Sequence, residues 1–150
     1  MQWLEEFATA SGLSTDQLID RAGNSIAKEI RAILGRVADR RLLFLVGPGN
    51  NGSDGLVSAS TLSKWGAKVT AYLLTKRRTN DEKANLAKKE QVTVIPVELD
   101  PGLKNLALEI KRSDLIVDAV LGTGQNRPLQ GVIKKTMGML KDREGLLVSL

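Results

Sequence analysis

Apolar residues recur along this chain in two alternating patterns. Unbroken apolar runs, such as the one within residues 41–46, are typical of strands that are covered on both faces of a parallel sheet. Between them lie stretches with one apolar face, clearest where an apolar residue returns every fourth position from Leu18 to Ile30. Ser14 to Gln17 has the sequence of a capping box before that stretch, and Gly35 ends it. The sequence therefore predicts helices that alternate with buried strands.

The predicted elements alternate through the rest of the chain. Strands are expected at residues 41–46, 68–74, 92–96, 115–120 and 146–150, and helices at 3–10, after Ser14, and at 53–65, 81–90, 102–112 and 132–140. Such alternation predicts an α/β fold of the Rossmann-like, doubly wound type. Its sheet is mainly parallel, with helices on both faces. No linker or repeat interrupts the pattern, so we expect one domain over residues 1–150.

The commonest strand order of such folds predicts where a ligand binds. In that order the first and fourth strands are neighbours, and ligands bind beyond their carboxyl ends. The loops that follow Val46 and Val120 should therefore face each other. These two loops also carry the most unusual chemistry in the sequence.

Composition removes several classes of chemistry. The chain has no Cys and no His, which excludes disulfides, thiol nucleophiles and an imidazole base. The longest apolar run, Leu42 to Val46, is far shorter than the roughly 20 residues of a membrane span. The first residues include Glu5 and Glu6, unlike the basic start of a secretory signal. We therefore expect a soluble, cytoplasmic protein that has no membrane partner.

The net charge of +5 suits a nucleic-acid partner, but only five residues are aromatic. Few side chains are thus available to stack on bases, and nucleic acid is not the expected partner. Basic clusters such as Lys76-Arg77-Arg78 are interpreted as solvated faces.

The turn from Gly47 to Gly55 is the first candidate site. Its glycines allow positive φ and let backbone N–H groups approach a ligand, and the start of a helix attracts anions. Gly47, Gly49 and Gly52 also satisfy the dinucleotide pattern G-x-G-x-x-G, which indicates a nucleotide-like ligand.

Three features complicate this interpretation of the glycine turn. The ribose-binding acid after the second strand is missing, and Lys76-Arg77-Arg78 would suit NADP there. Asp54 is expected in the first turn of the helix, where it would repel a pyrophosphate unless a cation intervened. A simple tight turn, with Asn51 or Ser53 capping the helix, is the alternative.

The second candidate site runs from Asp114 to Gly131. Asp118 lies inside an apolar strand, where an ionised carboxylate must be paired, bind a cation or be protonated. Arg127, a backbone N–H or a cation are possible partners, and a structural salt bridge or buried hydrogen bond is the alternative. An oxygen-rich site made by Asp118, Asn51 and backbone carbonyls would prefer a hard cation.

Three segments resemble the YjeF N-terminal family of NAD(P)H-hydrate (NAD(P)HX) epimerases. They are Leu18 to Gly23, then GPGNNGSDGL, then DLIVDAVLGTGQNRPLQG. The resemblance implies a Rossmann-like fold, commonly a homodimer, a bound potassium ion, and NADHX or NADPHX as substrate. Such enzymes interconvert the two epimers of this damaged cofactor. A partner dehydratase, fused or separate, uses only one epimer and can then restore all of the cofactor.

The resemblance also implies roles for residues at matching positions. Potassium would be bound by Asn51 and Asp118, and Asp118 is the expected catalytic carboxylate. The other implied residues hold the substrate: Asn50, Asn51, Gly52, Ser53 and Asp54 on one side, and Gly122, Thr123, Gly124, Gln125, Asn126, Arg127 and Pro128 on the other. Thr123 and Arg127 are the expected phosphate contacts.

Two departures from the family pattern matter. Ser53 replaces a usual glycine, and if that position needs positive φ the Cβ costs roughly 1 kcal/mol. The chain also stops at Leu150, where the family continues into a substrate aspartate and a potassium-ligand serine. We expect a fragment of a longer protein, and the alternative is an incomplete site without epimerase activity. Two other functions stay open: a non-catalytic, ligand- or RNA-binding dimerisation module of this fold, and an NADP-binding oxidoreductase half-domain.

Overall fold

A five-stranded sheet forms the centre of the structure, a computed structural model that describes residues 12–122 and 130–150. Its order is β3-β2-β1-β4-β5, and every neighbouring pair is parallel. The strands are β1 (Arg41–Val46), β2 (Lys68–Leu73), β3 (Thr93–Pro96), β4 (Leu115–Ala119) and β5 (Leu146–Ser149). The predicted doubly wound order, with the first and fourth strands as neighbours, is confirmed.

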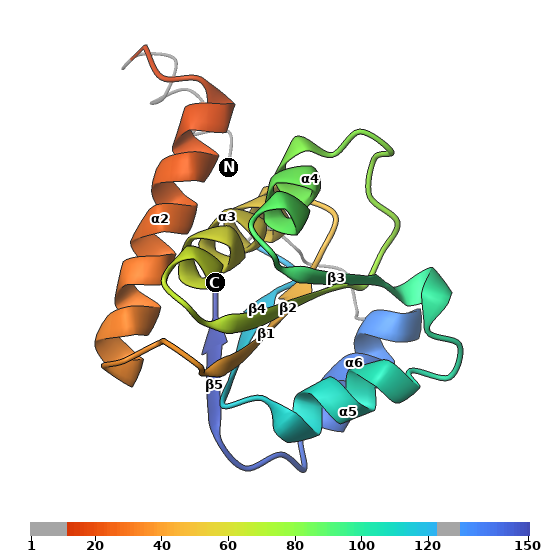
Figure 1. The fold of residues 1–150 in the computed structure, drawn as a ribbon. Coiled ribbons are helices and arrows are strands. Elements are labelled where there is room, and N and C mark those ends of the chain that lie inside the picture. The colour runs from red at the N-terminus through yellow and green to blue at the C-terminus, as the bar shows by residue number, and fades with distance from the viewer. Residues whose placement is uncertain (1–11, 123–129) are drawn as a thin grey trace.

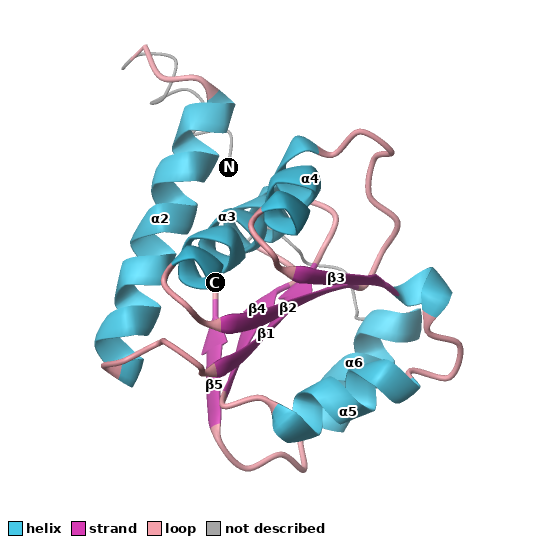
Figure 2. Ribbon diagram, in the orientation of Figure 1, coloured by secondary structure: helices cyan, strands magenta, loops and turns pink. Residues whose placement is uncertain are grey.

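Helices cover both faces of this sheet (Figures 1 and 2). They are α2 (Thr15–Leu34), α3 (Asn50–Lys64), α4 (Glu82–Lys89), α5 (Lys104–Arg112) and α6 (Gly131–Leu140), with one 3-10 turn at Val97–Leu99. Helices α2, α3 and α4 lie on one face, whereas α5 and α6 lie on the other. The helix expected at residues 3–10 lies outside the described residues.

Each inner strand contributes to two hydrophobic cores. In β1, Leu42 and Phe44 pack under α2, α3 and α4, whereas Leu43 and Leu45 pack under α5 and α6. All four side chains are at most 1% exposed. Because successive side chains of a strand point to opposite faces, both sets must be apolar, which explains the unbroken apolar run.

The first described helix, α2, begins and ends as its sequence predicts. The Ser14 hydroxyl accepts a hydrogen bond from the Gln17 N–H, and the Gln17 side chain accepts one from the Ser14 N–H. At the other end, Gly35 takes a φ of 71°. Along its length α2 packs closely on α3, because a Cβ at Gly23 would lie only 2.5 Å from Val57 Cβ.

One helix boundary was wrong in the sequence prediction. Helix α3 begins at Asn50, three residues before the expected start at Ser53. The first turn of α3 therefore contains the two asparagines of the glycine turn.

Within residues 12–122 and 130–150, no helix is both long and apolar enough to cross a membrane.

Candidate functional site

The loops after β1 and β4 meet at the carboxyl edge of the sheet, as their strand order predicts. The Gly47 N–H donates a hydrogen bond of 3.0 Å to the carbonyl of Ala119, the last residue of β4. A Cβ at Gly122 would lie 4.0 Å from Asn51 Cβ, so the second loop runs beside the start of α3. Two segments more than 70 positions apart in the sequence thus form one edge site.

The glycines of this turn serve close packing. None of Gly47, Gly49, Gly52 and Gly55 has positive φ, so the turn does not use the left-handed backbone that glycine allows. A Cβ at Gly47 would overlap the carbonyl of Val120, and one at Gly55 would lie 2.7 Å from Ala119 Cβ. These glycines let the beginning of α3 sit directly on the end of β4.

The beginning of α3 leaves backbone donors at the edge. Gly49 is the N-cap and supplies no side chain, so neither Asn51 nor Ser53 caps the helix as the simple-turn alternative requires. The first N–H bonded within this turn is that of Ser53, which donates to the Gly49 carbonyl at 3.2 Å. The N–H groups of residues 50–52 precede it and are available to an anionic ligand.

Asn51 stands in this first turn with an unused amide. Its side-chain nitrogen is buried and has no hydrogen-bond partner among the described residues. An unpaired polar atom costs free energy in a protein interior, so natural structures usually pair it with protein, water or ligand. Asn51 is therefore a well-placed residue for a ligand at this edge.

Ser53 is accommodated without backbone strain. It lies within α3, and its φ is not positive. Among the described residues, the non-glycine residues with positive φ are Asp39, Gln91 and Leu103. The cost expected for a Cβ at this position is therefore not incurred. The Ser53 hydroxyl instead accepts a hydrogen bond of 2.8 Å from Arg77.

Arg77 is the residue of this region that sequence reasoning missed. Its side chain is 7% exposed, although the cluster Lys76-Arg77-Arg78 was expected to form a solvated face. It pairs with Asp81 at 2.6 Å and also donates to Gly47 O and Ser53 Oγ. The signal in the sequence was an Arg just beyond a buried strand and four positions before an acid that caps the next helix.

Asp54 lies in the second turn of α3, which corrects its expected place in the first turn. The residue is half-buried, and burial raises the pKa of its carboxyl to about 6. The group can therefore exchange a proton close to neutral pH.

Asp118 is the last residue but one of β4. It pairs in register with Leu45, so its side chain lies on the face covered by α5 and α6. One carboxylate oxygen accepts a hydrogen bond of 3.1 Å from the Val120 N–H. Of the partners considered from the sequence, a backbone N–H is thus present. Residues 123–128, including Arg127, lie outside the described residues.

A cavity of about 540 Å³ opens beside the glycine turn. Gly49, Asn50 and Ser53 form one wall, and residues of the β2–α4 loop and of α2 form the others. A second cavity, of about 410 Å³, lies at the amino edge of the sheet near Arg41 and Lys68. We assign the site to the carboxyl edge, because ligands of doubly wound folds bind there.

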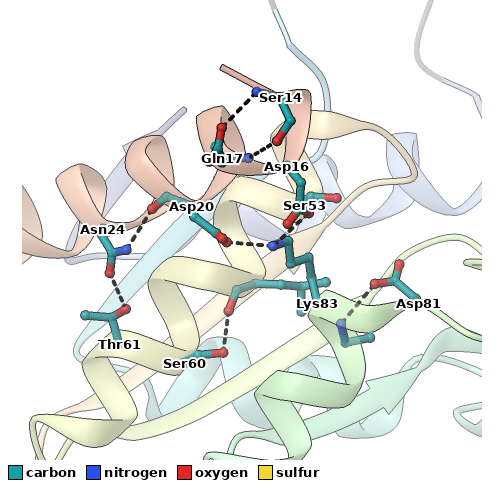
Figure 3. Close-up of polar contacts among 12 residues, drawn as sticks. Ser14, Asp16, Gln17, Asp20, Asn24, Ser53, Ser60, Thr61, Asp81 and Lys83 are labelled. Atoms are coloured by element: carbon teal, nitrogen blue, oxygen red, sulfur yellow. Dashed lines mark hydrogen bonds and ion pairs between the residues drawn. The ribbon is translucent and has the colours of Figure 1, made fainter. Parts of the chain in front are cut away.

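Ion pairs hold α2 against this cavity (Figure 3). Lys83 bridges Asp20 at 2.6 Å and Asp16 at 2.9 Å. Burial alone would lower the pKa of Lys83, but the two carboxylates raise it above its ordinary value. Nearby, the Thr61 hydroxyl of α3 donates to the Asn24 side chain of α2 at 2.8 Å.

Comparisons with known proteins agree with these features. Residues 15–150 match the profile of the family described as YjeF-related protein N-terminus. The chain is 33% identical over 151 residues to a bifunctional NAD(P)H-hydrate repair enzyme of Thermofilum pendens, covering 97% of this chain and 28% of that protein. It is 36% identical over 140 residues to an NAD(P)H-hydrate epimerase of Rhodobacter capsulatus, covering 87% and 63%.

A solved structure shares the fold. The crystal structure of yeast YNL200c superposes with a TM-score of 0.80 at 25% sequence identity, covering 97% of this chain and 64% of the yeast chain. The chain thus spans less than two thirds of the length of each of these relatives.

Proposed function

Because the chain belongs to the family of YjeF-related protein N-termini, we propose that it is an NAD(P)H-hydrate epimerase, an isomerase that interconverts the two epimers of NADHX or NADPHX. One structural observation carries the proposal. The start of α3, with its free N–H groups and Asn51, meets the loop after β4 at the carboxyl edge. Relatives named NAD(P)H-hydrate epimerase support it.

The substrate is held between the two loops in this proposal. Asn50, Asn51, Gly52, Ser53 and Asp54 form one wall, and residues 122–128 form the other. The backbone donors of residues 50–52 and the dipole of α3 favour a negatively charged group, such as a phosphate of the nucleotide. The glycine at position 52 lets this turn pack closely, because a Cβ there would lie 2.2 Å from the Gly47 carbonyl oxygen.

The donor set at the edge suits a potassium ion. The unpaired Asn51 amide needs a partner, and turning it by 180° exchanges its nitrogen and oxygen without moving the backbone. Amide and carboxylate oxygens are ligands for hard cations, and the described residues contain no cluster of three His, Cys, Asp or Glu that would favour another metal. Asn51 and Asp118 would hold the ion. When bound, it offsets negative charge in the site.

Epimerisation requires loss and return of the hydroxyl of the hydrate. The hydroxyl takes up a proton and leaves as water, and water then adds to the opposite face of the ring and gives a proton back. Asp54, with a pKa of about 6, can supply and recover that proton. Asp118 is the proposed catalytic carboxylate because its side chain would hold the ion that offsets negative charge in the site.

The proposed partner is an NAD(P)HX dehydratase. An epimerase makes the whole pool available to an enzyme that uses one epimer, and relatives named as bifunctional repair enzymes suggest that both activities can share one chain. We also propose a homodimer. The experiment that tests the activity is epimer exchange, followed by chromatography of the two epimers.

The NADP-binding oxidoreductase alternative loses part of its support. It relied on Lys76-Arg77-Arg78 to bind the extra phosphate of NADP, but the Arg77 guanidinium is already bound to Asp81, Gly47 and Ser53. No observation in the described residues favours the RNA-binding alternative over the epimerase.

A further inference from the structure

Arg77 uses all three of its guanidinium nitrogens within the protein. Nε donates to Asp81 Oδ2 at 2.6 Å, one terminal nitrogen donates to the Gly47 carbonyl, and the other donates to Ser53 Oγ at 2.8 Å. With 7% of the side chain exposed, these contacts are largely shielded from water. Charge-assisted hydrogen bonds of this kind are about twice as strong as neutral ones.

These contacts join three segments at the candidate site. Gly47 is the first residue after β1, Ser53 lies in the first turns of α3, and Asp81 is the N-cap of α4. Asp81 is itself fixed, because its second oxygen accepts the Ala84 N–H at 2.9 Å. The glycine turn is therefore tied to a rigid point on α4.

The local sequence is compatible with this arrangement. A Cβ at Gly52 would lie 2.2 Å from the Gly47 carbonyl oxygen and 2.8 Å from the Arg77 nitrogen that bonds it, so any other residue there would disturb this contact. Ser53 supplies the third acceptor, and a glycine at this position would remove it. Lysine at position 77 would keep the charge but would lose the planar fork that reaches three partners.

We propose that Arg77 is a positioning residue for the epimerase. Through Gly47 and Ser53 it fixes the backbone of residues 47–53, so that the N–H groups of residues 50–52 are held in the orientation that binds the anionic part of the substrate. Asp81 orients the Arg77 guanidinium, and the Ser53 hydroxyl connects that guanidinium directly to α3. The proposal rests on the proposed function, but the effect of Arg77 on the backbone of residues 47–53 can be measured without any enzyme activity.

The first test is the kinetic comparison of Arg77→Lys with the exposed control Lys76→Ala. We expect R77K to raise KM for one NADHX epimer by about 10- to 100-fold, with kcat within about threefold of wild type, because misplacing a binding group by an ångström costs this much. K76A should match wild type. Arg77→Ala should recover part of the loss in millimolar guanidinium, well below denaturing concentration. An unchanged KM in R77K, or no recovery of R77A, would overturn the proposal.

The second test needs no activity. Amide hydrogen exchange at positions 47 and 53, whose N–H groups are hydrogen-bonded in the folded protein, should be at least about tenfold faster in R77K and in Ser53→Gly than in wild type or K76A, at equal global stability. The double variant should be little faster than either single one, because both remove the same contact. Exchange equal to wild type in R77K would refute the positioning role even if the protein is an epimerase. If wild type does not interconvert the epimers but the amide hydrogen exchange follows the predicted pattern, only the proposed function is refuted.

Discussion

Gly47 donates its N–H to the carbonyl of Ala119, so the turn after β1 lies directly on the end of β4. A side chain at position 47 would collide with the carbonyl of Val120, the next residue of the same strand end. The two loops that form the candidate site are therefore held together by backbone contact, and this contact needs glycine.

Gly47→Ala should be strongly destabilising. The new Cβ overlaps backbone, which cannot rotate away, so we expect a loss of about 2–3 kcal/mol in the free energy of unfolding. Gly138→Ala is the matched control, since it lies within α6 with nothing within 4 Å of its Cβ position and should gain roughly 0.5–1 kcal/mol. Urea unfolding of both variants measures the difference. Equal effects would contradict the packing role of Gly47.

Asp54→Asn should stabilise the protein in a pH-dependent way. The folded pKa of about 6 lies above the ordinary value of 3.8, so between these values the folded state holds more protons than the unfolded state. Wild-type stability should therefore fall as pH rises from 4 to 6. Asn carries no charge and avoids this loss. Melting temperatures of the two proteins should converge at pH 4 and diverge at pH 7, and a constant gap would contradict the raised pKa.

Tyr72→Phe should destabilise the hydrophobic core between the sheet and helices α5 and α6. The buried hydroxyl donates to Asp100 Oδ2 at 2.9 Å, and its removal should cost about 1–2 kcal/mol. Burial of Asp100 opposes ionisation, yet the N–H groups of Asn105 and Leu106 and the Tyr72 hydroxyl hold the pKa of Asp100 below its ordinary value. This contribution is present above pH 4 and is lost as pH falls below that value. Acid unfolding of Y72F should therefore begin at higher pH than in wild type.

Lys83→Ala should loosen α2 from α4. The side chain is 12% exposed and bridges two carboxylates, so we expect a loss of about 1 kcal/mol that shrinks in high salt. Lys64→Ala, which removes the more exposed pair with Glu90, should cost less than about 0.5 kcal/mol. Denaturation at low and high salt compares the two variants. A larger effect at Lys64 would contradict this ranking.

The fold could be predicted from the sequence because its strands are covered on both faces. That arrangement makes β1 apolar at every position from Leu42 to Val46, which distinguishes it from the half-polar helices beside it. The alternation then specified a parallel sheet, and the usual order placed β1 beside β4. The start of α3 was misjudged because Gly49, which caps it, has no side-chain signal.

The candidate site was only partly predictable. Its two loops were found because glycines and a strand carboxylate stand out in a sequence, but the reason for the glycines is contact with distant backbone at Ala119 and Val120. The burial of Arg77 was missed for the same physical reason, although its spacing from Asp81 is visible in the sequence. It depends on Gly47 and Ser53, which approach Arg77 only once β1 and β2 have paired.

The most direct test of the account is epimer interconversion by the purified protein. A single NADHX epimer is incubated with wild type or Asp118→Asn, with and without potassium, and the two epimers are resolved by chromatography. We predict that wild type equilibrates the epimers faster than buffer alone, that potassium increases this rate, and that D118N lowers it by about 100-fold or more. Wild-type rates no faster than buffer, or D118N rates equal to wild type, would contradict the proposed epimerase mechanism.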